Sequence, residues 1–179
     1  MAKKTRKPNG SGKPKAKKVK KVENVDNGDI ANRNVLEAKL KAAVFGEIMS
    51  VMLQSPRHSK VTLGTLARQM VPAFMSDQYV LARAQADNVE LPPTPVGVAF
   101  WASVSDAVDQ RLTADLDTPI EIKPDEWKSG DIIWLLDIVA APQVSSALVK
   151  SIREKVGPDK TIKVRAADAD GQAAVKTLD

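Results

Sequence analysis

The feature that most limits the fold is the apolar run IIWLLDIVAA at residues 132–141, which contains one polar side chain, Asp137. It follows the turn signal Ser129-Gly130-Asp131. The run is far shorter than the roughly 20 residues that span a bilayer, so we expect a soluble protein. A short apolar run bounded by a turn is typical of a buried strand. We therefore predict a central strand here.

Three helices are predicted from apolar residues that recur at helical spacing. The first covers residues 34–53, the second follows Ser55-Pro56, and the last is closed by Gly157-Pro158. Their inward faces are predicted to consist of Leu36, Leu40, Val44, Ile48, Val51 and Met52 in the first helix, Leu63, Leu66, Met70 and Phe74 in the second, and Val144, Leu148, Ile152 and Val156 in the last.

Strands are predicted where β-branched and aromatic residues cluster between turn signals. The remaining predicted segments are strands at 78–85 and 96–103, a loop at 92–95, a short helix at 105–112 capped by Ser105, an extended or irregular stretch at 119–127, and a hairpin of 161–166 and 172–178 around residues 168–171. This order of elements predicts a single α/β or α+β layered domain.

The charge of the chain is concentrated at its start. Residues 1–22 carry ten basic side chains and no acidic one, so the remainder is net acidic although the whole chain is +5. We predict a disordered Lys-rich tail at residues 1–31 and a folded domain at residues 32–179. The tail is either a solvated segment or an electrostatic tether for nucleic acid, anionic lipid or an acidic protein.

The content of cysteine and histidine excludes several kinds of chemistry. With no cysteine and one histidine, the chain has no thiol nucleophile and no disulfide, and we expect no metal site. The first 22 residues lack the apolar stretch of a secretory signal. These features fit a cytoplasmic location.

Two residues are the strongest candidates for chemistry. Asp137 needs polar partners if it is buried, either a catalytic neighbour or backbone amides at a strand end. His58, the single histidine, lies in a junction between two helices, where it is either an exposed loop residue or a proton acceptor that works near pH 7. If the two side chains pair, the carboxylate can fix the imidazole tautomer and stabilise its charged form.

Three stretches resemble the RTX toxin-activating lysine acyltransferases, the family typified by the hemolysin-activating protein. Ser55-Pro56-Arg57-His58 is similar to the family's Ser-Pro-x-His segment, and the strand ending in Phe100-Trp101-Ala102 is similar to its Ser-Trp-Ala strand. The stretches Trp127-Lys128-Ser129-Gly130-Asp131 and Trp134-Leu135-Leu136-Asp137 resemble its Trp-x-Ser-Gly-Asp and Trp-Phe-x-Asp signatures. The resemblance covers roughly residues 44–165, and Ser59 stands where many relatives have Arg.

The resemblance implies a GNAT-like acyltransferase fold with a central, mostly antiparallel sheet flanked by helices. It implies that His58 and Asp137 form the catalytic pair, acting as a general base or through an acyl-histidine intermediate. The implied reaction moves a fatty acyl group from acyl carrier protein to internal lysines of an RTX-type protoxin in the cytoplasm, with no bound cofactor. A homodimer is also suggested by the family.

Further residues are candidates for supporting roles. Ser55 is either a helix N-cap, the interpretation that we favour, or a group that holds the loop or the substrate. Of Trp101, Trp127 and Trp134, which are candidates for lining an acyl tunnel, we expect at least two in the core. Lys150 and Arg153 either contact acyl carrier protein or form a solvated helix face.

Two other kinds of protein compete with this interpretation. One is a non-enzymatic protein that binds nucleic acid or another acidic partner through its Lys-rich tail; the net acidic body and the lack of a nucleic-acid motif make nucleic acid an unfavourable partner. The other is a catalytically inactive scaffold, against which the retained His58 and Asp137 argue. Deleting residues 1–22 separates the first from an acyltransferase, because only the binding protein depends on the tail.

Overall fold

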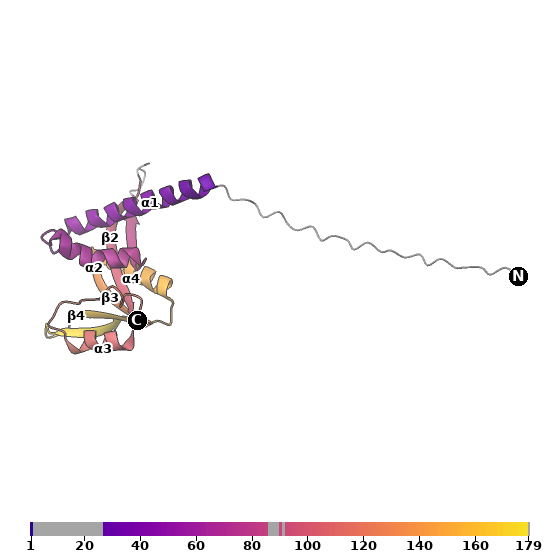
Figure 1. Cartoon of the computed structure of the whole chain (residues 1–179). Helices are drawn as coiled ribbons and strands as arrows, with labels where there is room; N and C mark the ends of the chain where they lie inside the picture. Colours follow the sequence, from indigo (N-terminus) through magenta and orange to yellow (C-terminus); the bar gives the residue numbers. More distant parts are fainter. Residues whose placement is uncertain (2–26, 86–89, 91, 179) are drawn as a thin grey trace. The chain divides into compact units, whose positions relative to one another are not determined.

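The computed structural model describes residues 1, 27–85, 90 and 92–178 (Figure 1). The chain divides into two units, residues 1–37 and 38–179. In the first unit, the residues from 27 onward form the start of helix α1 (Asn27–Gln54). Most of the predicted tail, residues 2–26, lies outside the described residues, and the helix begins at Asn27 rather than at residue 34.

The second unit is a mixed α/β domain built on one five-stranded sheet of order β1-β2-β3-β4-β5. Only β3 and β4 pair in parallel, and the other neighbours are antiparallel. The predicted order of elements and the mostly antiparallel sheet are confirmed. Besides α1, the elements are α2 (Leu63–Met75), β1 (Tyr79–Ala84), β2 (Thr94–Val104), α3 (Asp106–Ala114), β3 (Ile132–Ala140), α4 (Pro142–Val156), β4 (Ile162–Ala167) and β5 (Ala173–Leu178).

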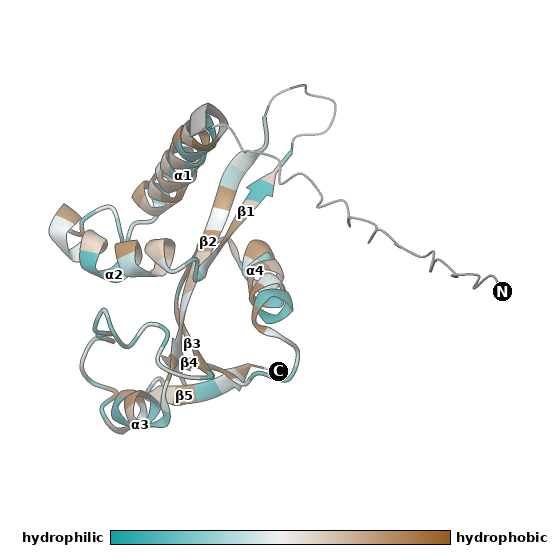
Figure 2. Ribbon diagram, turned by 45° about the vertical axis from the view of Figure 1, so that its right-hand side comes forward, coloured by the Kyte–Doolittle hydropathy of each residue, from teal (hydrophilic) through white to brown (hydrophobic). Residues whose placement is uncertain are grey.

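The sheet separates two apolar layers. Alternate residues of β3 point to opposite faces, so Trp134 packs in one layer and Ile133 and Leu135 pack in the other. The first layer is completed by α2, α3 and the later part of α1, and the second by α4. Figure 2 shows α4 and α2 on opposite sides of the strands. The central position predicted for the 132–141 run is confirmed.

The predicted inward face of α1 is only partly correct. Ile48, Val51 and Met52 are buried, whereas Leu36 and Leu40 are each 58% exposed. Helical spacing shows which side chains share a face, but it does not show how far the neighbouring elements extend along that face. The prediction was therefore wrong for the first part of this helix.

The turn before β3 requires glycine at position 130 because backbone atoms of β2 lie too close for a Cβ atom. A Cβ atom at this position would lie 2.5 Å from the Val104 carbonyl oxygen and 2.6 Å from Ser105 Cα, both of which are backbone atoms. Its amide donates to the Ser103 carbonyl at 3.2 Å, so the turn is fastened to β2. The glycine permits this close approach of two backbone segments.

We expect Gly130→Ala to lower the free energy of unfolding by about 1–3 kcal/mol, because the added methyl group must displace backbone. Urea unfolding followed by circular dichroism measures this change. Gly46→Ala in α1 is the matched control, since nothing lies within 4 Å of its added Cβ. That control should be neutral or stabilising by up to about 1 kcal/mol. Equal unfolding midpoints for the two variants would contradict the packing account.

Candidate active site

Asp137 reaches the α2 side of the sheet because β3 contains a bulge. Phe100 pairs with Asp137 and Trp101 pairs with Leu135, so Leu136 is an extra residue in β3. A bulge breaks the strict alternation of side chains and re-aims its residues. Leu136 and Asp137 therefore line the same cavity, although they are consecutive in the strand.

His58 is held in the turn that joins α1 and α2. The amides of His58 and Ser59 donate to the Ser55 carbonyl at 3.0 and 2.9 Å, and the His58 carbonyl accepts from Val61. The His58 residue is only 8% exposed, so it is a buried residue rather than an exposed loop residue. The backbone bonds of the turn thus fix where the imidazole lies.

The two candidates for chemistry meet although 79 positions separate them in the chain. His58 Nε2 lies 2.7 Å from Asp137 Oδ2, and His58 Nδ1 lies 2.9 Å from Ser55 Oγ. An ionised carboxylate only accepts hydrogen bonds, so we assign the hydrogen of the neutral ring to Nε2. The Ser55 hydroxyl then donates to Nδ1, which carries the basic lone pair.

Arg57 is a site residue that sequence reasoning missed. Its Nη2 atom contacts Asp137 Oδ1 and lies 3.4 Å from His58 Nε2. The Asp137 carboxylate is therefore shared between a buried imidazole and a guanidinium whose side chain is 69% exposed. The available signal was its place directly before the histidine in the Ser-Pro-Arg-His segment.

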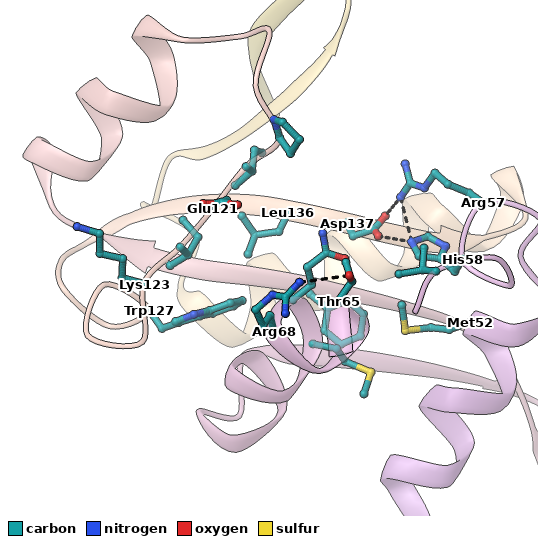
Figure 3. A pocket seen from close by; sticks show the side chains of 17 residues that line it. Met52, Arg57, His58, Thr65, Arg68, Glu121, Lys123, Trp127, Leu136 and Asp137 are labelled. Atoms are coloured by element: carbon teal, nitrogen blue, oxygen red, sulfur yellow. Dashed lines mark hydrogen bonds and ion pairs between the residues drawn. The ribbon is translucent and has the colours of Figure 1, made fainter. Parts of the chain in front are cut away.

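A cavity of about 520 Å³ opens beside the pair. Its volume lies within the usual range for small-molecule sites, about 300 to 1,000 Å³. Figure 3 shows His58 and Asp137 at one end, and Glu121, Lys123 and Trp127 toward the other. The apolar part of the lining consists of Met52, Val61, Met70, Phe100, Pro119, Ile120, Ile122, Trp127 and Leu136.

The wall formed by residues 119–123 was also missed. This segment was predicted as extended or irregular, without a place in the site, and in the structure it contributes five consecutive residues to the cavity. Ile120 and Ile122 are partly buried while Glu121 and Lys123 are exposed. The alternation of apolar and polar side chains in Ile120-Glu121-Ile122-Lys123 was the signal for a half-buried extended segment.

Ser55 does not have the role that we favoured. The helix after the turn begins at Leu63 with Thr62 as its N-cap, and the Thr62 hydroxyl accepts from the Thr65 amide at 3.2 Å. The N-cap interpretation of Ser55 was therefore wrong. Its hydroxyl bonds the His58 ring instead, because the segment after Ser55 forms an isolated turn rather than a helix start.

The three tryptophans divide between core and cavity. Trp134 is fully buried and donates from Nε1 to Asp109 at 2.8 Å, and Trp101 packs in the layer under α4. Trp127 is the one of the three that lines the 520 Å³ cavity. The expectation of at least two core tryptophans is confirmed.

The proposed contacts for acyl carrier protein lie on α4, across the sheet from His58. Lys150 is exposed. Arg153 donates to the Leu178 carbonyl at 2.6 Å, so its guanidinium is partly used in holding the end of β5. A role for either residue in carrier binding stays a prediction.

The described residues include no group of three or more His, Cys, Asp or Glu side chains placed to hold a metal ion. None of the helices in this part of the chain is long and apolar enough to cross a membrane.

The arrangement supports general acid–base chemistry. A neutral imidazole whose tautomer is fixed by a carboxylate can accept a proton, and the carboxylate stabilises the imidazolium that results. The apolar part of the adjoining cavity provides a surface for a hydrocarbon group. The fold and the site define a mixed α/β protein with a histidine–aspartate pair at the end of a partly apolar cavity.

Comparison with known proteins identifies the family. Residues 37–178 match the RTX toxin acyltransferase family, and the chain belongs to it. It is 30% identical to an RTX-I toxin-activating lysine-acyltransferase of Actinobacillus pleuropneumoniae over 72% of this chain and 69% of that one. A leukotoxin-activating lysine-acyltransferase of a Pasteurella haemolytica-like species is 31% identical over 62% and 61%. A protein-lysine myristoyltransferase of Escherichia coli is 26% identical over 68% and 64%.

Proposed function

We propose that this protein transfers a fatty acyl group from the thioester of acyl carrier protein to the ε-amine of internal lysines in an RTX-type protein. The observation that carries this proposal is the contact between His58 Nε2 and Asp137 Oδ2 at the end of a cavity whose lining is about half apolar. Membership of the acyltransferase family supports it, as do the relatives named for lysine acylation of RTX toxins. We expect the reaction to take place in the cytoplasm.

The free ε-amine of lysine has a pKa of about 10.4 and is protonated near pH 7, so it first loses one proton to solvent, and a base must take a second proton when the amide bond forms. Only the neutral amine carries the lone pair that attacks a carbonyl carbon. In the tautomer assigned here, the basic lone pair of His58 is at Nδ1, where the Ser55 hydroxyl already donates. As the neutral amine attacks, the proton that its nitrogen loses therefore passes to Nδ1 through Ser55 Oγ, and Asp137 stabilises the charged ring.

The transfer itself exchanges one bond for another. The lysine nitrogen bonds to the thioester carbonyl carbon while the carbonyl electrons move onto oxygen. When the carbonyl reforms, the carbon–sulfur bond breaks, and the leaving thiolate takes the proton from His58. The products are an acyl-lysine amide and a free thiol, and His58 returns to its neutral form.

Purified protein, acyl carrier protein charged with a saturated chain, and an RTX-type repeat protein test the proposal directly. We expect the repeat protein to gain the mass of one acyl chain on lysine, with release of an equal amount of carrier thiol. The same chain on coenzyme A serves as the competing donor. Acylation from coenzyme A but not from the carrier would contradict acyl carrier protein as the donor. No acylation from either thioester would contradict the proposed acyl transfer.

The cavity predicts how the acyl chain is selected. If the chain extends from His58 along the apolar wall, Ile120→Trp should shorten the longest chain that is used efficiently. Burial of each methylene is worth about 0.8 kcal/mol, so kcat/KM should fall about fourfold for each methylene that is excluded. A series of carrier thioesters of increasing length measures this. A uniform fall in kcat/KM at every length would contradict this placement of the chain.

A further inference from the structure

A second cavity meets the site on the Ser55 side of His58. Its volume is about 330 Å³, and it shares Arg57 and His58 with the larger cavity. Asp137 lines only the larger cavity, whereas Ser55 lines only the smaller one. The two ring nitrogens of His58 are therefore divided between the cavities, with the Nε2 partner in one and the Nδ1 partner in the other.

We propose that the smaller cavity binds the side chain of the acceptor lysine, so that the two substrates reach His58 from different cavities; this inference rests on the proposed function. The lone pair that takes the lysine proton is at Nδ1, whose partner Ser55 lines this cavity. An amine that enters here meets the basic nitrogen without passing the Asp137 carboxylate. The acyl chain then occupies the larger cavity without competing with the lysine side chain.

The lining of the smaller cavity suits a neutral alkylamine. Its walls come from the end of α1, the turn at residues 55–58, the start of β2 and residues 138–141. The stretches from β2 and residues 138–141 are apolar. The cavity has no carboxylate among its lining residues, and its one formally charged side chain is the Arg57 guanidinium. A positive charge repels an ammonium ion but not an uncharged amine. The cavity therefore favours the form of lysine that can attack a thioester.

Nα-acetyl-lysine methylamide is the probe for this site, and His58 is the reporter. Because the sequence contains one histidine, every imidazole NMR signal comes from this residue. We expect the probe to shift the His58 ring signals in a saturable way, with tighter binding as the pH rises and more of the amine is neutral. The nitrogen shifts also identify the tautomer, with the hydrogen on Nε2.

Matched variants assign the binding to one cavity. Gln54 and Ala141 are exposed residues that line the smaller cavity from different elements, so Gln54→Trp and Ala141→Trp should each weaken probe binding at least tenfold. Leu53→Trp is the control, because Leu53 is 61% exposed and lines neither cavity. Ile120→Trp, which narrows the larger cavity, should leave probe binding within about twofold of the unmodified protein, a change of only about 0.4 kcal/mol.

The outcomes separate this inference from the proposed function. In an acyl-transfer assay, Gln54→Trp should raise KM for the acceptor and leave KM for the charged acyl carrier protein unchanged. No probe-induced shift in the unmodified protein, or equal loss of binding in Ile120→Trp and Gln54→Trp, would overturn the inference. Probe binding with the expected pattern but no acyl transfer by the unmodified protein would instead overturn the proposed function and leave the amine site standing.

Discussion

Replacing His58 with glutamine should lower the rate of acyl transfer by about 10²–10⁴, the usual contribution of a general base. Glutamine can still donate a hydrogen bond to Asp137, but it has no group that accepts a proton near pH 7. Single-turnover transfer from acyl carrier protein measures the chemical step. A rate within a few-fold of the unmodified protein would exclude His58 as the base.

The fold of the His58→Gln variant must be checked, since His58 is buried in the turn that joins α1 and α2. Its circular dichroism spectrum and its unfolding midpoint, measured without the lysine analogue, should stay close to those of the unmodified protein. Rapid quenching of the unmodified enzyme with donor alone also separates the two mechanisms. An acyl group trapped on the single histidine would establish an acyl-histidine intermediate, whereas general-base catalysis predicts none.

Asp137→Asn should also lower the transfer rate by about 10²–10⁴, since the same change in a serine-protease triad costs about 10⁴ in kcat through the wrong tautomer. The amide nitrogen can donate to His58, which places the ring hydrogen on Nδ1 and removes the basic lone pair from the side of Ser55. The charged ring also loses its stabilising partner. The nitrogen NMR chemical shifts of His58 should show the changed tautomer, and the transfer assay should show the lower rate.

Asp131→Asn is the matched control for the loss of a carboxylate. Asp131 belongs to the turn before β3, its side chain is 88% exposed, and it contacts Lys160 outside the site. The Lys160 hydrogen bond and charge lower the pKa of Asp131. We expect the control to transfer at the rate of the unmodified protein. If Asp131→Asn and Asp137→Asn slowed transfer equally, the pair would have no special role.

Much of the fold follows from local pattern. The buried strand β3, the spine of α4 and the hairpin of β4 and β5 each have their own periodicity and turn signals, so their positions were predictable. The exposure of Leu36 and Leu40 was not predictable in this way, because it depends on which other elements pack against that face of α1. The catalytic candidates were found because the sequence offers one histidine and one carboxylate within an apolar strand.

The geometry of the site was not predictable in the same way. The bulge at Leu136 depends on how β2 and β3 pair, and no local signal marks it. Without it, alternation would place Leu136 and Asp137 on opposite faces of the sheet. The contact of Arg57 with Asp137 depends on how the turn packs against this strand, whereas the Ser55 bond to His58 lies within the turn. The bulge and the Arg57 contact arise from pairing between distant segments, which a single sequence does not display.

The most direct test of the account is the intact mass of an RTX-type repeat protein coexpressed in a bacterial cytoplasm with this protein or with its His58→Gln variant. The account predicts a fatty-acyl mass increment on lysine with the unmodified protein and none with the variant. Two results would contradict it. One is an equal increment with both proteins, and the other is no increment when folded protein and charged acyl carrier are both shown to be present.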